Sequence, residues 1–470
     1  MNLYPDQQQT VEDVRAAMRV SKSVLLQSPT GSGKTAMATH IIEAAKNKDR
    51  RIIFTVPRKD LLEQTSQTFT RLGIDHSFIA AGKAHNPFAR VHIGMVDSMA
   101  RRLERLPASD LVIFDETHFG ASSLDSVIQH YKKAGSWILG LSGTPWKLSG
   151  KGLGCWYDTM VEGRSIRWLI DNKRLSDYRY FYGRSAIDLS ALRITAGDYA
   201  KGEVASFMEE KAVIIGDAVR DYRERCAGML HMVRCASIKH SQMTAQAFRD
   251  AGIPAMHVDG ETPMDERGRI FRAYARRELF VVTFVNLLEF GFDLSQASGG
   301  LDVCIESGAD LKPSRSLAGQ MQFWGRMLRY KPTPAVFNDN VNNYKQHGFP
   351  ADARDWTLAD RDQSRRESGE RALPVRQCER CYYVHRPAHS CANCGHVYEI
   401  QSRQIDQVDG ALVEMTREEQ ERARQAAMGE RKAAQAQAKT LDDLIALGRA
   451  RGMKNPAGWA RHVYSARGGR

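Results

Sequence analysis

The feature that most constrains the fold of this chain is a glycine-rich segment between an apolar run and a helical stretch. The apolar run is Val24-Leu25-Leu26, and the segment after it is Ser28-Pro29-Thr30-Gly31-Ser32-Gly33-Lys34-Thr35. This order predicts a short buried strand, a tight turn and a helix that begins at Lys34, because glycines adopt backbone conformations closed to residues with a Cβ. Such a turn points backbone N–H groups at a phosphate. The segment therefore predicts a phosphate-binding loop in an α/β fold.

The same loop contains candidate ligands for a nucleotide and a cation. We expect Lys34 to reach the β and γ phosphates and the hydroxyl of Thr35 to bind Mg²⁺. A chance glycine-rich loop is the alternative for this segment taken alone. The other predicted nucleotide contacts of the loop are Thr30, Gly31, Ser32 and Gly33.

Two adjacent carboxylates follow a second apolar run. Leu111-Val112-Ile113-Phe114 is apolar throughout, which favours a central parallel strand covered on both faces. Asp115 would then lie at the carboxyl end of the strand, where open α/β sheets bind ligands. We expect Asp115 to coordinate Mg²⁺ and Glu116 to polarise the attacking water. Two surface carboxylates are the alternative for an isolated pair, and the upstream Lys34 argues against it.

The second half of the chain predicts another parallel sheet that has no phosphate loop of its own. Its expected strands include residues 231–237 and 279–284. Further on, Gly325, Arg326 and Arg329 are predicted on one helical face, because residues three apart are neighbours on a helix. We expect Arg329 to act as an arginine finger toward the γ phosphate and Arg326 to make a second phosphate contact. Surface ion pairs are the alternative for these arginines.

Further short segments complete an ordered series of motifs with those above. The series is Leu3-Tyr4-Pro5-Asp6-Gln7, Thr55-Val56-Pro57-Arg58, Ile93-Gly94-Met95-Val96-Asp97-Ser98, Asp115-Glu116-Thr117-His118, Ser142-Gly143-Thr144-Pro145, Gly291-Phe292-Asp293 and Gln322-Phe323-Trp324-Gly325-Arg326-Met327-Leu328-Arg329. Through these motifs, which span roughly residues 1–360, the chain resembles a superfamily 2 helicase of the DEAH-like group that includes type III restriction-enzyme motors of prokaryotic or bacteriophage type. Thr117 departs from the Ala or Cys of that family, and Tyr4 and Asp6 stand where Arg and Tyr are more usual.

The resemblance implies two tandem RecA-like parallel-sheet lobes with an ATP cleft between them. It also implies that Gln7 reads the adenine edge, that Gly291 contributes to nucleotide binding, and that Asp293 meets the ribose or the coupling network. ATP and Mg²⁺ are the implied cofactors. The implied catalytic residues are Lys34, Asp115, Glu116, Arg326 and Arg329.

Two further roles follow from the resemblance. Ser142, Thr144 and Gln322 are implied to couple hydrolysis to movement of the lobes. Arg58 and Ser98 are implied to contact the backbone of a nucleic acid.

The charge of the chain favours a polyanionic partner. Lys and Arg number 67 against 55 Asp and Glu, for a formal net charge of +12. With the resemblance, this predicts sequence-independent, salt-sensitive contacts to the nucleic-acid backbone, with DNA preferred to RNA. The longest apolar stretch, near residues 279–292, is interrupted by Asn286 and Glu289 and predicts no membrane span. We therefore expect a soluble protein in the cytoplasm of a prokaryotic cell, or of the host if a phage encodes it.

Four of the eight cysteines form two CxxC pairs, and these predict a structural zinc site. Cys378 and Cys381 form the first pair, and Cys391 and Cys394 follow after nine residues. Four thiolates complete a tetrahedral Zn²⁺ site and leave no catalytic position. Disulfides are the poorer alternative in a reducing compartment. The nearby histidines, taken as bystanders, are His385, His389 and His396. The loop between the pairs could contact nucleic acid, by stacking on bases or binding phosphates, or could pack on the motor, and the sequence leaves both open.

Composition predicts five segments in the chain. They are the ATP-binding lobe (1–171), the second lobe (172–360), a charged linker (361–374), a zinc ribbon (375–400) and a basic helical tail (401–470). An exposed helix is expected beyond Glu414, an amphipathic turn or two from Leu441, and another helix from Pro456. The sequence leaves three roles open for the tail, namely binding DNA, docking on the motor or docking on a partner protein.

The expected function is an ATP-dependent DNA helicase or translocase that unwinds or remodels DNA in repair, recombination or replication. The resemblance implies 3′ to 5′ polarity. One alternative is an RNA helicase. The other is an ATP-gated nucleic-acid-binding adaptor that recruits a nuclease through the zinc ribbon or the tail, because the chain has no nuclease-like carboxylate cluster of its own.

Overall fold

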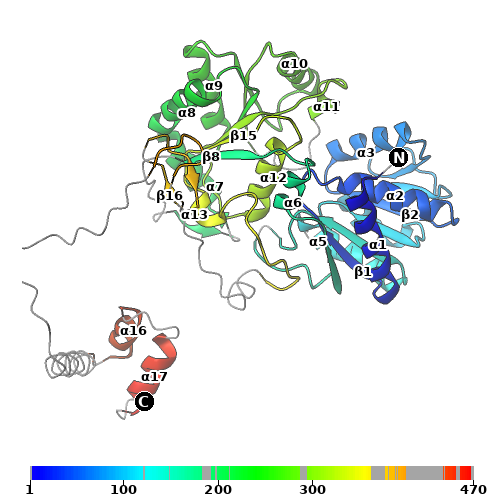
Figure 1. The fold of residues 1–470 in the computed structure, drawn as a ribbon. Coiled ribbons are helices and arrows are strands. Elements are labelled where there is room, and N and C mark those ends of the chain that lie inside the picture. The colour runs from blue at the N-terminus through cyan, green and yellow to red at the C-terminus, as the bar shows by residue number, and fades with distance from the viewer. Residues whose placement is uncertain are drawn as a thin grey trace, which may run out of the picture. The chain divides into compact units, whose positions relative to one another are not determined.

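The chain divides into two units, Met1–Tyr398 and Glu399–Arg470, and each is described by itself. The computed structural model describes residues 3–119, 122–147, 149–182, 192–195, 198–210, 212–285, 294–360, 376–378, 380–386, 388, 390–397, 438, 440–450 and 456–466. The first unit contains two parallel sheets flanked by helices, shown in Figure 1 in blue to cyan and in green to yellow. The expectation of two tandem parallel-sheet lobes is confirmed.

Lobe 1 is built on a parallel sheet whose seven described strands run in the order β3-β4-β2-β5-β6-β1-β7. The strands are β1 Ser23–Gln27, β2 Ile52–Val56, β3 Ser77–Ile79, β4 Val91–Met95, β5 Leu111–Phe114, β6 Trp137–Ser142 and β7 Thr159–Glu162. The helices are α1 Pro5–Val20, α2 Lys34–Lys46, α3 Lys59–Arg71, α4 Val96–Ala100, α5 Ser122–Lys133 and α6 Ile166–Asp171, with short 3-10 turns at Leu103–Arg105 and Thr117–Phe119. Every residue of β1, β2 and β5 is buried, as expected for strands covered on both faces.

Lobe 2 contains a parallel sheet whose six described strands run in the order β12-β13-β11-β14-β15-β8. The strands are β8 Tyr178–Tyr182, β11 His231–Arg234, β12 Ala255–Val258, β13 Val281–Phe284, β14 Ser307–Asp310 and β15 Ala335–Asp339, with a small hairpin of β9 Ile194–Thr195 and β10 Asp198–Tyr199. The helices are α7 Lys201–Glu210, α8 Ala212–Arg225, α9 Ile238–Asp250, α10 Met264–Ala275, α11 Leu294–Ala297, α12 Leu317–Met327 and α13 Tyr344–His347. The strands predicted at 231–237 and 279–284 are present as the shorter β11 and β13.

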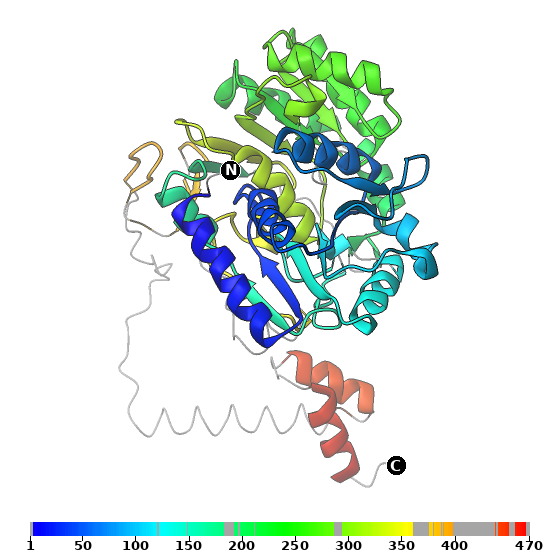
Figure 2. The ribbon, with the colours of Figure 1, turned by 90° about the vertical axis from the view of Figure 1, so that its right-hand side faces the viewer.

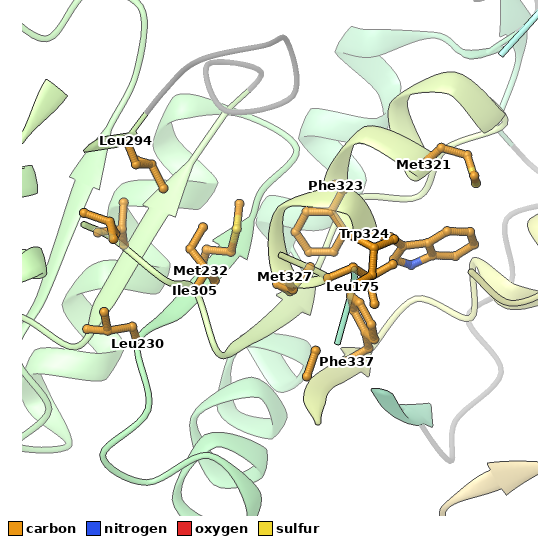
Figure 3. Packing of buried hydrophobic residues seen from close by; sticks show 14 of the residues in the cluster. Leu175, Leu230, Met232, Leu294, Ile305, Met321, Phe323, Trp324, Met327 and Phe337 are labelled. Carbon is orange, nitrogen blue, oxygen red and sulfur yellow. The ribbon is translucent and has the colours of Figure 1, made fainter. Parts of the chain in front are cut away.

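The core of lobe 2 places α12 beside the segment that joins the two lobes. Phe323, Trp324 and Met327 of α12 pack with Leu175 of the joining segment and Phe337 of β15 (Figure 3). All five side chains are at least 98% buried. Three side chains of α6, namely Ile166, Leu169 and Ile170, belong to the same core cluster. In Figures 1 and 2, α12 lies on the side of the second sheet that faces lobe 1.

After lobe 2 the chain returns to lobe 1 through residues 356–360, which we call the strap. The backbone N of Gly152 donates to Asp360 Oδ1 at 2.9 Å, and that of Gly154 donates to the Leu358 carbonyl oxygen at 3.0 Å. The indole N–H of Trp146 donates to the carbonyl oxygen of Ala359 at 2.8 Å. The lobes are therefore connected twice, once by the segment between α6 and β8 and once by the strap.

A small hairpin of β16 Arg376–Gln377 and β17 Val384–His385 follows in the first unit. In the second unit, α16 Leu441–Ala450 and α17 Pro456–Ala466 pack around the buried Leu444 and Ala460. The two helices expected from Leu441 and Pro456 are therefore present. The expected linker at 361–374 and the helix expected beyond Glu414 lie outside the described residues. Across the described ranges, none of the helices combines the length and apolarity needed to cross a membrane.

The strap makes Gly152 a sensitive position. A Cβ on Gly152 would fall on the backbone of Leu358 and Ala359, far inside van der Waals contact. We expect Gly152→Ala to destabilise lobe 1 by about 1–3 kcal/mol, because backbone atoms cannot move aside as a side-chain tip can. The matched control is Gly216→Ala in α8, where a Cβ would meet nothing within 4 Å and helix propensity improves. Thermal unfolding midpoints report both effects, and an unchanged midpoint for Gly152→Ala would contradict the strap contact.

Candidate nucleotide site between the lobes

The glycine-rich loop lies between β1 and α2, as the sequence predicts. Gly31 and Gly33 have φ of +88° and +89°, in the left-handed region that favours glycine. Lys34 is only 8% exposed, and its Nζ donates to the carbonyl oxygens of Ser28 at 3.0 Å and Pro29 at 3.4 Å. The ammonium group is therefore held inside the loop that would surround a phosphate. Thr35, the expected Mg²⁺ ligand, is exposed at the start of α2.

The N-terminal glutamine motif is hydrogen-bonded to this loop. Gln7 donates from Nε2 to the carbonyl oxygen of Ser32 at 3.0 Å and accepts from the backbone N of Tyr4 at 3.1 Å. Arg174, in the segment joining the lobes, lies 3.3 Å from Asp6 Oδ1 and 3.5 Å from the centre of the Tyr4 ring. The two departures from the family pattern at this motif, Tyr4 and Asp6, therefore share one cationic partner.

The two carboxylates follow β5, which is separated from β1 in the sheet by β6 alone. Gln322 of α12 donates to Glu116 Oε1, and the second oxygen, Oε2, lies 3.3 Å from His118 Nδ1. His118 Nδ1 is also 2.8 Å from the hydroxyl oxygen of Ser142. That hydroxyl donates its own proton to the carbonyl oxygen of Thr144 at 2.5 Å. His118 Nδ1 must therefore be the donor. Within the described part of the chain, Glu116 Oε2 is buried and accepts no hydrogen bond.

Burial changes the protonation of two groups at this edge. Burial first, and then the neighbouring Glu116, raise the pKa of the Asp115 carboxyl, while Lys34 opposes the rise. Burial lowers the pKa of His118 to about 4, so that its imidazole is neutral at neutral pH. A divalent cation would favour the charged form of Asp115. The donor set at this edge, a carboxylate beside a phosphate loop, suits Mg²⁺.

Helix α12 of lobe 2 reaches into this site from across the lobe boundary. The amide of Gln322 donates to Glu116 Oε1 at 3.0 Å and accepts from the Thr30 hydroxyl at 3.2 Å. Gly325 lies against Thr30 so closely that a Cβ there would be 2.7 Å from Thr30 Cγ2 and closer still to Thr30 Cβ. One glutamine therefore joins the phosphate loop and the predicted water-polarising carboxylate.

Arg326 and Arg329 do not share a helical face, so that part of the sequence prediction is wrong. Arg326 is inside the helix and 6% exposed, but α12 ends at Met327, and Arg329 lies beyond the cap residue Leu328 in an exposed position. The reason is local: Arg329 pairs with Leu175 in an isolated bridge, and the hydroxyl of Ser176 donates to the Arg329 carbonyl at 3.0 Å. The segment joining the lobes therefore holds the backbone of Arg329.

Sequence reasoning missed a buried ionic network beneath α12. Arg234, at the end of β11, donates from Nε to Asp310 Oδ1 at 2.9 Å, and its side chain also bonds Gln320 of α12. Asp310 Oδ2 accepts from Gln320 at 3.0 Å and from Asn343 at 2.9 Å. A charged residue closing a buried strand was the only signal in the sequence. The network fixes α12 to the carboxyl ends of β11 and β14.

The remaining predicted site residues are more dispersed. Arg58 is the partly exposed N-cap residue of α3, whereas Ser98 is 5% exposed within α4. Gly291 and Asp293 lie outside the described residues.

The four predicted zinc ligands come together. Their Sγ atoms all lie within 4.8 Å of one another, and the pairs Cys378–Cys394 and Cys381–Cys391 are each 3.6 Å apart. Ligands at the usual Zn–S distance of about 2.3 Å in a tetrahedron are about 3.8 Å apart, whereas a disulfide requires about 2.05 Å. The spacing therefore fits a tetrahedral Zn²⁺ site and excludes the disulfide alternative.

The loop of this ribbon packs on lobe 2. Tyr383 forms an antiparallel bridge with Phe181 of β8, and their ring centres are 5.9 Å apart. Arg386 lies 3.7 Å from Asp352 of the same unit. Because β8 is an edge strand, the ribbon covers backbone groups that would otherwise be open to pairing.

Sequence comparison relates this chain to known proteins over much of its length. Residues 1–147 match the family described as type III restriction enzyme, res subunit. The chain is 31% identical over 382 residues to a 51.5 kDa protein of a Lactococcus phage, with 81% of this chain and 79% of that protein covered. The chain is also 26% identical over 348 residues to IRC3 of Saccharomyces cerevisiae, named as an ATP-dependent helicase. That match covers 69% of this chain but about half (49%) of IRC3.

Two solved structures share the fold. A fragment named as an HsdR subunit of a type I restriction enzyme from Vibrio vulnificus YJ016 superposes with a TM-score of 0.56 at 17% identity, covering 73% of this chain and 65% of the other. The type ISP restriction-modification enzyme LlaBIII, solved bound to DNA, has a TM-score of 0.51 at 15% identity and covers 73% and 28%.

We expect Cys391→Ser to release zinc from the ribbon, because three thiolates and a hydroxyl hold Zn²⁺ far more weakly than four thiolates. Elemental analysis of the purified chain measures this directly. The matched control is Cys155→Ser, since Cys155 is exposed and outside the cluster. Wild-type protein purified without chelators that contains no zinc would contradict the assignment.

Proposed function

Because the chain belongs to the superfamily 2 helicases of the restriction-motor group, which are ATP-dependent nucleic-acid enzymes, we propose that it is a DNA helicase or translocase. We propose further that it unwinds or remodels DNA in repair, recombination or replication, with the 3′ to 5′ polarity implied by the family. We propose the segment boundaries predicted from the sequence: the first lobe ends at 171, the second at 360, the linker at 374 and the zinc ribbon at 400.

One observation carries the proposal. Gln322, from lobe 2, bonds both Thr30 of the phosphate loop and Glu116 of lobe 1. A group that contacts the nucleotide-binding loop and the water-polarising carboxylate from the opposite lobe makes the separation of the lobes depend on the state of the nucleotide. That dependence is what a motor requires.

We propose the following roles for the residues of the site. Bound ATP and Mg²⁺ supply the phosphoanhydride to be cleaved and the cation that neutralises its charge. Lys34 binds the phosphates, with the N–H groups of its loop. Glu116 orients the attacking water through Oε2, the oxygen left without a hydrogen bond, and accepts its proton. Arg326 and Arg329 stabilise the charge that develops on the γ phosphate.

Several features support DNA as the track. The formal charge of +12 favours a polyanion. Arg58 is the N-cap residue of α3, and we propose that it makes a phosphate contact of the type that carries no sequence information. IRC3 is named as a helicase, and LlaBIII was solved with DNA. We propose that the zinc ribbon is a structural part of lobe 2, and that the helical tail is a further contact for DNA or for a partner protein.

The first test is ATP hydrolysis by the wild type and Lys34→Ala, measured alone and with single-stranded DNA, duplex DNA, forked DNA or RNA. We expect stimulation by DNA that weakens as salt is raised, and no stimulated turnover by Lys34→Ala. Stimulation by RNA only would favour an RNA helicase. No stimulation by any nucleic acid would overturn the motor proposal in favour of an adaptor.

The second test concerns the approach of the lobes. Gly325→Ala places a Cβ against Thr30, and we expect it to lower ATP turnover by about 10-fold or more through misplacement of the site. Gly319→Ala is the matched control on the same helix, because its Cβ would meet only the side chain of Ser316, at ordinary distances of 3.5 Å from Oγ and 3.8 Å from Cβ. Both changes replace a glycine of α12 by alanine, which raises helix propensity. Equal turnover of the two variants would show that the close approach has no role in hydrolysis.

A further inference from the structure

The residue after Glu116 has an unusual buried partner. Thr117 stands where the family carries Ala or Cys, and it is only 1% exposed. Its Oγ1 lies 2.7 Å from the hydroxyl oxygen of Tyr157, itself 1% exposed. In the described part of the chain, each hydroxyl has the other as its only hydrogen-bond partner. The departure at Thr117 is therefore matched by a tyrosine 40 residues further along the chain.

Tyr157 has little freedom to move away from Thr117. Its ring lies against the main chain of Gly140 in β6, where a Cβ would be 2.5 Å from the Tyr157 hydroxyl and 2.7 Å from Cε1. The backbone N of Tyr157 donates to Leu153 at 3.1 Å. The strap bonds Gly152, just before that turn, and Gly154, within it. Burial raises the pKa of the Tyr157 phenol above its ordinary value, so that the phenol stays protonated.

The backbone beside this pair needs external support. Glu116 has φ of +46°, a left-handed conformation that costs a non-glycine residue conformational free energy and persists only where its surroundings hold it. On one side, the backbone N of Glu116 donates to Asp115 Oδ1 at 3.0 Å. On the other side, the first anchored side chain is that of Thr117. A hydroxyl bonded to the core of the lobe can therefore set the direction of the Glu116 side chain.

We propose that Thr117 and Tyr157 form a positioning pair that aims Glu116 at the attacking water. The proposal rests on the proposed function, because it assigns Glu116 the water-orienting role. Neither residue touches the reacting atoms, and both act through the backbone of Glu116. The pair also links the strap, and through it the end of lobe 2, to the carboxylate in lobe 1.

The test compares Tyr157→Phe, Thr117→Val and the double variant. Each single change leaves one hydroxyl buried without a partner, whereas the double change removes both. We expect each single variant to lower kcat by roughly 10-fold with the KM for ATP unchanged within about twofold, because small misplacements of a catalytic group cost up to about 10²-fold. We expect the double variant to regain the unfolding midpoint of the wild type while kcat stays low. Thr117→Ser, which keeps the hydroxyl, should restore turnover.

Matched controls separate positioning from packing. Tyr131→Phe removes a similarly buried hydroxyl of the same lobe, which donates to the Pro107 carbonyl at 3.0 Å, and should leave kcat unchanged. DNA-stimulated hydrolysis by the wild type that Glu116→Gln abolishes shows that the proposed motor ATPase and the role of Glu116 in it hold. With that shown, wild-type kcat in the single variants, or recovery of kcat together with stability in the double variant, would overturn the positioning pair. Absence of wild-type hydrolysis would overturn the proposed function and the pair with it.

Discussion

The close approach of α12 to the phosphate loop is the contact on which the rest of the structure depends. Gln322 uses both ends of its amide, one toward Thr30 and one toward Glu116, and Gly325 provides the room for the two lobes to meet. Buried polar groups of this kind are costly when unpaired, so the contact is stable only while both lobes are in register. The Gln322 amide therefore ties the position of α12 to the phosphate loop and to Glu116 at the same time.

Helix α12 can carry this contact because lobe 2 holds it by two different means. Its apolar face, with Phe323, Trp324 and Met327, is buried in the core. Its polar Gln320 is bonded to the ion pair of Arg234 and Asp310. The apolar contacts supply stability, whereas the buried pair adds little net stability but disfavours any shift of the helix that would leave a charge unpaired. Together they define one position for α12 relative to the second sheet.

The chain also limits how the lobes move by crossing between them twice. The first crossing carries Arg174, which contacts Tyr4 and Asp6, and Leu175, which pairs with Arg329. The second crossing is the strap, bonded to Gly152 and Gly154 at the start of the turn that holds Tyr157. Both crossings therefore end beside residues of the nucleotide site. Lobe 2 is therefore attached to lobe 1 at these two crossings as well as through α12.

The local elements of the site could be predicted from the sequence, whereas the contacts between residues far apart in the chain could not. The strand–loop–helix unit at Lys34, the carboxylates after β5 and the four zinc ligands were predictable, because strand burial, glycine conformation and CxxC spacing act over a few residues. The shared face for Arg326 and Arg329 was wrongly predicted because periodicity does not show that Ser176 and Leu175 capture the chain beyond Met327. Contacts such as Thr30 with Gln322, Thr117 with Tyr157 and Arg234 with Asp310 join residues far apart in sequence. The sequence by itself determined which chemical groups the site contains. Only the tertiary structure decided which of them meet, because packing of whole sheets and helices, and no local preference, sets those distances.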